Sequence, residues 1–178
     1  MSLSPIKKLR RIEREIQLLE NKNSNHISLS QIKNLRVKAQ LNKTIILDLL
    51  IFVRFYNDFI RVNILIPDFY PFKKPTVLIK NRKYLDLLTN IDRRYLMILN
   101  NEYDFSKYRS KSFCLCCHSI LCKQNWGPSS KIYLILEEIE INYVTIKRIK
   151  EIILCEQVFK HKFKGNSLDF IRIVYSFL

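Results

Sequence analysis

The hydrophobic positions of the chain recur first with a helical period and then with a strand period. Between residues 5 and 20 they are spaced three and four apart, which predicts a helix with one apolar face. That face comprises Ile6, Leu9, Ile12, Ile16 and Leu19. Three segments rich in β-branched residues follow and predict strands, at residues 27–38, 44–55 and 59–66. Asn57 and Asp58 favour a hairpin turn, so we expect an antiparallel meander.

A proline-rich stretch ends the meander, with Pro67, Pro71 and Pro75 falling within nine residues. Proline is excluded from helix interiors and from central strands, so this stretch predicts a stiff loop. The loop leads into a short fourth strand at residues 77–79.

The remainder of the chain returns to the helical period. Apolar residues spaced three and four apart predict a helix over residues 84–99. Further helices are predicted to begin near residue 132 and to cover residues 145–160 and 167–177. Because the strands are grouped and helices flank them, we predict an α+β fold. It has an N-terminal helix, an antiparallel meander sheet of about four strands and C-terminal helices.

Length and composition are those of one folded domain. A chain of 178 residues that is 48% hydrophobic can bury a core. We expect one domain over residues 1–178, with a helical insertion around 81–102 and extra C-terminal helices at about 145–178. The chain carries 31 Lys and Arg against 16 Asp and Glu, a net charge of +15. A balance this basic suits an acidic protein, an anionic membrane surface or nucleic acid as a partner. AT-rich coding, which favours lysine codons, can produce the same balance.

Five cysteines bear on compartment and chemistry. Four lie within nine residues and one lies apart: Cys114, Cys116, Cys117, Cys122 and Cys155. An odd, clustered set is untypical of a secreted domain held by disulfides, and the first residues lack the apolar core of a signal peptide. The longest apolar stretch, residues 45–53, is too short to cross a bilayer. We expect no membrane span and a cytoplasmic or nuclear location.

Other chemistry is sparse in the sequence. Two glycines in the whole chain argue against a glycine-rich phosphate loop, and no cofactor is expected. No nucleic-acid-binding module is recognisable, so nucleic acid is not an expected partner.

Several motifs follow one another in a suggestive order. The first helix contains Leu-Arg-Arg-Ile-Glu-Arg-Glu-Ile, and the proline loop contains Tyr-Pro-Phe-Lys-Lys-Pro-Thr-Val from Tyr70 to Val77. Cys117-His118-Ser119-Ile120-Leu121 is followed by Asn125-Trp126-Gly127-Pro128. In this order and spacing, residues 5–145 resemble the ubiquitin-conjugating enzymes. The resemblance implies the ubiquitin-conjugating fold and a transferase that carries a ubiquitin-like modifier as a cysteine thioester.

The resemblance also implies roles for particular residues. Cys117 stands at the family's distance before the tryptophan, and Cys114 lies in the alternative match Phe113-Cys114-Leu115; either is a candidate nucleophile. The implied partners are ubiquitin or a ubiquitin-like protein, its activating enzyme and a ubiquitin ligase. The residues implied to bind the two enzymes are Lys7, Lys8, Arg11, Phe72, Pro128 and Ser129.

Two alternatives stay open at this point. The family's His-Pro-Asn sequence before the cysteine is missing, which suggests an inactive variant acting as a binding or scaffold subunit. Alternatively, soft ligands from Cys114, Cys117, His118 and Cys122 suggest a zinc-stabilised domain, although His118 adjoins Cys117 and a second cysteine pair is missing. A single cysteine here can also be a small buried hydrophobe, and Phe72 can pack on its own loop.

Overall fold

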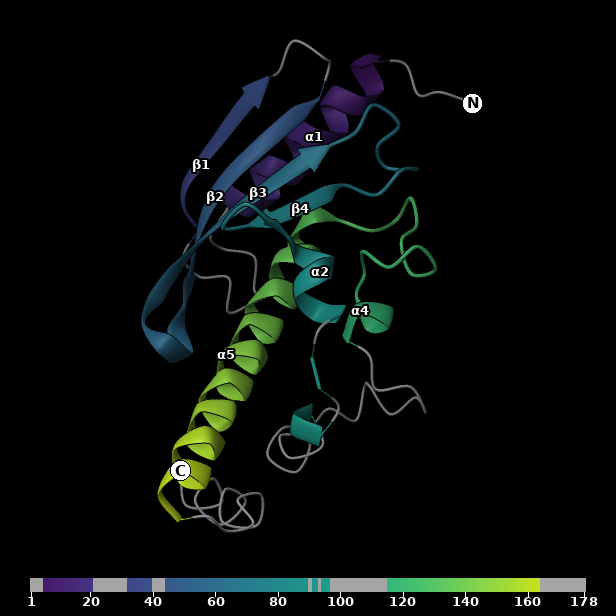
Figure 1. Cartoon of the computed structure of the whole chain (residues 1–178). Coiled ribbons are helices and arrows are strands. Elements are labelled where there is room, and N and C mark those ends of the chain that lie inside the picture. Colours follow the sequence, from purple (N-terminus) through teal and green to yellow (C-terminus); the bar gives the residue numbers. More distant parts are fainter. Residues whose placement is uncertain are drawn as a thin grey trace.

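The computed structural model describes residues 5–20, 32–39, 44–89, 91–92, 94–96 and 115–163. Within them the chain is α+β (Figure 1). Helix α1 (Pro5–Glu20) comes first, and the later helices are α2 (Tyr84–Thr89), α4 (Leu115–His118) and α5 (Ile132–Phe163).

Between α1 and α2 the chain forms an antiparallel sheet in which each strand pairs with the next along the chain. Its strands are β1 (Ile32–Ala39), β2 (Ile45–Val53), β3 (Asp58–Ile66), β4 (Thr76–Ile79) and β5 (Arg82–Lys83). The predicted meander is confirmed, with five strands in place of about four. Residues 27–31 of the first predicted strand lie outside the described residues.

The fifth strand escaped prediction because it is two residues long. It pairs with β4 across Lys80 and Asn81, whose φ angles are 49° and 64°. Two left-handed residues in a two-residue loop match the right-handed twist of the flanking strands. The β2–β3 connection differs slightly from the prediction: a 3₁₀ turn at Arg54–Tyr56 precedes Asn57, and Asp58 already pairs with Val53.

The core lies on one face of the sheet. Alternate residues of β2 and β3 are fully buried there, among them Leu47, Leu49, Ile60 and Val62. Helix α1 contributes Ile12 to this cluster, and the first turns of α5 contribute a row of isoleucines and a leucine. Both helices therefore cover the same face of the sheet (Figure 1).

The predicted helix over residues 84–99 is wrong as a single element. Helix α2 ends at Thr89, whose hydroxyl donates to the Asp86 carbonyl. The side chain of Asp92 then accepts the backbone N–H of Arg94 and starts a new helical turn. The predicted apolar face is nonetheless buried at Tyr84, Leu88 and Tyr95.

The predicted helices that start near residues 132 and 145 are one continuous helix of 32 residues, α5. No glycine or proline interrupts it. The predicted helix at 167–177 lies outside the described residues.

Candidate functional site

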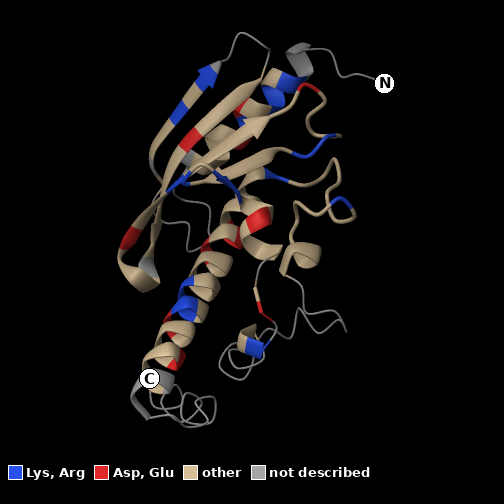
Figure 2. Ribbon diagram, viewed as in Figure 1, with Lys and Arg blue, Asp and Glu red and all other residues tan. Residues whose placement is uncertain are grey.

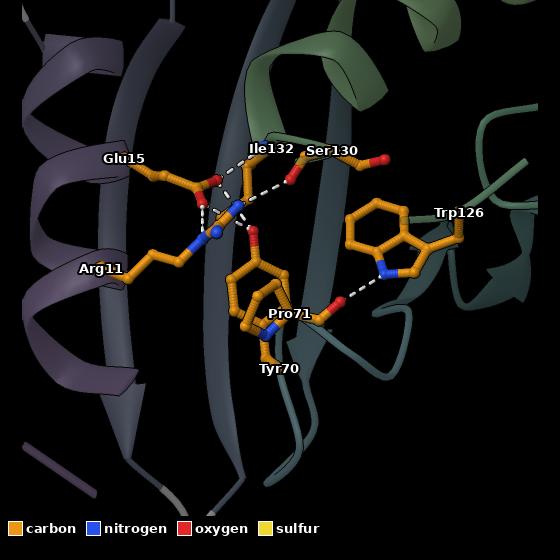
Figure 3. A network of polar contacts seen from close by, with 7 residues as sticks. All are labelled: Arg11, Glu15, Tyr70, Pro71, Trp126, Ser130 and Ile132. Carbon is orange, nitrogen blue, oxygen red and sulfur yellow. Dashed lines mark hydrogen bonds and ion pairs between the residues drawn. The ribbon is translucent and has the colours of Figure 1, made fainter. Parts of the chain in front are cut away.

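A buried carboxylate joins α1, the proline loop and the start of α5 (Figure 3). Glu15 is 6% exposed and accepts hydrogen bonds from the Tyr70 hydroxyl at 2.8 Å and the Ile132 backbone N–H at 2.8 Å. Arg11, one turn earlier on α1, donates to the same carboxylate at 2.8 Å. Because the first N–H groups of a helix lack partners within it, Glu15 caps α5 from a different helix.

We call Glu15 and the groups bonded to it, from Arg11, Tyr70 and Ile132, the hub. Its electrostatics follow from its burial. Tyr70 is fully buried, and burial together with the negative charge of Glu15 raises the pKa of its phenol. Arg11 lies over the Tyr70 ring at 5.6 Å and donates to the Ser130 carbonyl at 3.0 Å. The phenol therefore stays protonated, and its hydroxyl remains a donor to Glu15.

The proline loop contacts the tryptophan turn directly. Trp126 Nε1–H donates to the Pro71 carbonyl at 2.7 Å, and the Trp126 and Tyr70 ring centroids are 6.0 Å apart. The Tyr70–Pro71 peptide is cis. Two motifs that the sequence separates by about 55 residues thus form one surface (Figure 3).

The cysteine segment lies just before this turn. Within the described residues, none of Cys116, Cys117, Cys122 and Cys155 forms a disulfide. On α4, Cys117 is exposed and Cys116 is half-buried against the core, with their Sγ atoms 3.9 Å apart. Cys114, the other candidate nucleophile, lies outside the described residues.

Three side chains from elsewhere hold the backbone after Cys117. Asn125 uses both amide hydrogens, donating to the carbonyls of Cys117 at 2.8 Å and Ser119 at 2.9 Å. Glu138 of α5 accepts the Ile120 N–H at 2.6 Å, and Lys74 of the proline loop donates to the Leu121 carbonyl. These hydrogen bonds therefore hold in place the backbone that carries the Cys117 side chain.

The cations predicted to meet a partner do not all face outward. Lys8 is only 8% exposed and pairs with Asp68 at 3.2 Å, and Arg11 is engaged by Glu15. Leu9, predicted to face the core, is 47% exposed instead. Helix α1 thus turns Lys8 and Glu15 inward with Ile12, because the proline loop and the start of α5 offer those polar groups partners.

The other predicted partner residues are accessible. Phe72 is 57% exposed, and Pro128 and Ser129 are also exposed. The side chain of Lys7 lies outside the described residues.

A basic groove of about 640 Å³ runs between α1 and the segment that leads into α5. We call it the α1 groove; its lining residues are Arg10, Arg11, Arg14, Glu15, Leu18, Ser129 and Lys131. The ion pairs of the described residues include Arg11 but neither Arg10 nor Arg14. Figure 2 shows basic positions on α1 and also on β1 and α5.

The structure also bears on metal and membrane chemistry. Among the residues it describes, no three His, Cys, Asp or Glu side chains converge where they could hold one metal ion. Cys114 of the zinc hypothesis is not among those residues. In the same part of the chain, every helix is too short or too polar to cross a membrane.

Comparison with known proteins identifies no match among protein-family models, curated proteins or solved structures. Sequence reasoning named Cys117, Phe72 and Trp126, but it gave no role to Glu15, Asn125 and Glu138. Glu15 and Asn125 stand within the quoted motifs and Glu138 in none, and the partners of all three are distant or backbone groups that a motif does not show.

Proposed function

We propose that this chain is a conjugating enzyme of the ubiquitin-conjugating fold, carrying ubiquitin or a ubiquitin-like modifier on Cys117. The strongest support is the position of the exposed Cys117 thiol. Its backbone is held by a hydrogen bond from Asn125, next to the proline-loop and tryptophan motifs, which contact each other. A reactive group works best on a support held by other side chains. Here Asn125, Glu138 and Lys74 provide that support.

In the proposed reaction, the Cys117 thiolate attacks the thioester carbonyl that links the modifier to its activating enzyme. The carbon–sulfur bond to that enzyme breaks, its cysteine leaves as a thiolate, and the modifier stays on Cys117. A lysine amine then attacks the new thioester and forms an isopeptide bond, and Cys117 leaves with the proton that the amine loses. Cysteine suits both steps because its thiolate is a strong nucleophile and a good leaving group. Asn125 acts as a positioning residue by holding the carbonyls on either side of His118.

The test is a thioester assay with activating enzyme, ATP and a panel of ubiquitin-like modifiers. We expect an adduct on a non-reducing gel that dithiothreitol cleaves and that Cys117→Ser abolishes. Cys155→Ser, which alters an exposed cysteine on α5, is the matched control and keeps the adduct. Loss of the adduct in Cys114→Ser but not in Cys117→Ser moves the nucleophile to Cys114. If no modifier in the panel gives an adduct, the proposed enzymatic activity is contradicted.

The second candidate function is an inactive relative that binds a partner through the α1 groove. The cationic lining of that groove and the exposed Phe72 favour a docking role whether or not the thiol reacts. A ligase or activating enzyme that binds the chain without thioester formation supports this candidate. A zinc-stabilised domain predicts something else: loss of folding on chelation and in the cysteine variants.

A further inference from the structure

Two adjacent thiols on α4 form a pair, of which the proposed transferase uses only Cys117. Cys117 is exposed, Cys116 is half-buried beside it, and their Sγ atoms are 3.9 Å apart. We propose that Cys116 and Cys117 form a vicinal dithiol site that binds a trivalent, sulfur-seeking centre such as an organoarsenical. This proposal goes beyond the conjugating function and does not depend on it.

The spacing of the sulfurs fits a single bridging atom. Two sulfurs bonded at about 2.3 Å, the length of a zinc–thiolate bond, lie about 3.8 Å apart at a tetrahedral angle and about 3.3 Å at a right angle. The observed 3.9 Å lies just beyond the wide end of that range, so a small approach of the two sulfurs is needed. Cys116 packs against the core and is the fixed partner, whereas the exposed Cys117 side chain can rotate to close the gap.

The same pair is poorly suited to a disulfide. Neighbouring Cα atoms across a trans peptide are about 3.8 Å apart, whereas disulfides join Cα atoms separated by about 4.4–6.8 Å. Oxidation to a direct disulfide therefore requires distortion of α4. The geometry therefore favours two thiols over a direct disulfide, and two thiols are what a bridging atom requires.

The binding reaction balances without an oxidant or a reductant. An arsenic(III) oxide group, R–As=O, reacts with two thiols to give R–As(SR′)₂ and one water. Two arsenic–sulfur bonds form, the oxygen leaves with both thiol protons, and arsenic remains trivalent. The first bond forms at the exposed Cys117, and the second then closes within the protein. The second arsenic–sulfur bond is favoured because the bound arsenic and the second thiol are held together, which gives a high effective concentration.

The test treats the whole chain with phenylarsine oxide and follows intact mass. We expect one adduct whose mass gain equals the reagent less one water. It resists excess 2-mercaptoethanol, and a small dithiol such as 2,3-dimercaptopropanol removes it. Cys116→Ser and Cys117→Ser each leave one thiol of the pair, so their affinity falls by about a hundredfold or more and 2-mercaptoethanol strips the label. Cys122→Ser and Cys155→Ser are the matched controls and keep the resistant adduct.

Three results overturn the proposal. They are a wild-type adduct that 2-mercaptoethanol removes, a resistant adduct that survives in Cys116→Ser, and a resistant adduct that Cys114→Ser abolishes. Urea unfolding of each variant, with Cys116→Ala as a second replacement at the half-buried position, separates loss of the site from loss of the fold. The readout needs no modifier or activating enzyme, so it stands whether or not the thioester assay succeeds.

Discussion

On the outer face of the sheet one carboxylate, Asp48, is shared by two cations from neighbouring strands. It accepts both a 2.9 Å hydrogen bond from Arg61 Nε and a second bond from the same guanidinium, and Lys38 lies 3.4 Å away. The hydrogen bond from Arg61 lowers the pKa of Asp48 from 3.8 to about 2, against the opposing effect of its burial. A carboxyl group whose pKa is lower in the folded state than in the unfolded state stabilises the protein only at pH values at which it is ionised.

We predict that Asp48→Asn lowers the free energy of unfolding at pH 7 by about 1 kcal/mol. The pKa shift alone corresponds to about 2.5 kcal/mol, and exposure of both cations reduces that figure through solvent screening. The contribution is complete above about pH 4 and is lost as the pH falls towards 2. Urea unfolding at pH 7, 4 and 2 measures it, with Glu13→Gln on α1 as an exposed control. A wild-type advantage that persists at pH 2 contradicts the assignment.

At the scale of elements, Glu15 connects three parts of the chain that are distant in sequence. Its carboxylate is bonded to Arg11 on its own helix, to the proline loop through Tyr70 and to the first turn of α5 through Ile132. At the first turn of α5 the backbone N–H groups have no partner within the helix, and Glu15 supplies one of them with an acceptor. These hydrogen bonds tie α1 to the start of α5 and to the proline loop, which Trp126 in turn contacts.

We predict that Glu15→Ala lowers the free energy of unfolding by about 3–5 kcal/mol. The substitution leaves a charged guanidinium, a buried hydroxyl and a helix N–H without their shared acceptor. Urea unfolding gives the magnitude, and Glu13→Ala, exposed on the same helix, is expected to change stability by less than about 0.5 kcal/mol.

A second readout distinguishes the hub from general destabilisation. In Glu15→Gln, which keeps an acceptor but removes the charge, the amide of Ile132 should remain more protected from hydrogen exchange than in Glu15→Ala. Equal stability of wild type and Glu15→Ala would show that water replaces the carboxylate at no cost.

At the scale of the whole molecule, the net charge of +15 is spread over several elements (Figure 2). Lys8, Arg11 and Arg61 are each paired with a carboxylate within the fold. The α1 groove is different because Arg10, Arg14 and Lys131 line it together and are exposed. A surface of that kind steers an acidic partner and chiefly raises its association rate.

We predict that the double substitution Arg10→Glu and Arg14→Glu slows thioester formation with the activating enzyme about tenfold at low salt. The difference should shrink as ionic strength rises, because salt screens exposed charges beyond about 10 Å at 0.1 M. Lys80→Glu and Lys150→Glu, exposed on the β4–β5 turn and on α5, form the control with the same change in net charge. Equal slowing in the control would assign the effect to net charge and not to the groove.

Sequence pattern alone was sufficient for much of the fold. The period of apolar residues placed α1 and β3, because burial of one face imposes that period on any helix or strand, and a dense run of β-branched residues placed β2. The prolines placed the loop after β3 by removing backbone donors. The same reasoning failed for the helix over residues 84–99, because the capping side chain of Asp92 restarts the helix in a way that apolar period does not record.

Tertiary structure decided the use of each polar side chain. From sequence, Lys8 and Arg11 are expected to bind a partner, and Glu15, Asn125 and Glu138 have no assigned role. In the fold, Glu15 reaches a backbone N–H 117 residues away, and Glu138 reaches one 18 residues away. A hydrogen bond depends on position and direction in space, and these arise only when distant elements pack. The chain's sequence therefore determined which elements form and which thiols are present, and packing determined which thiol is presented and what holds it in place.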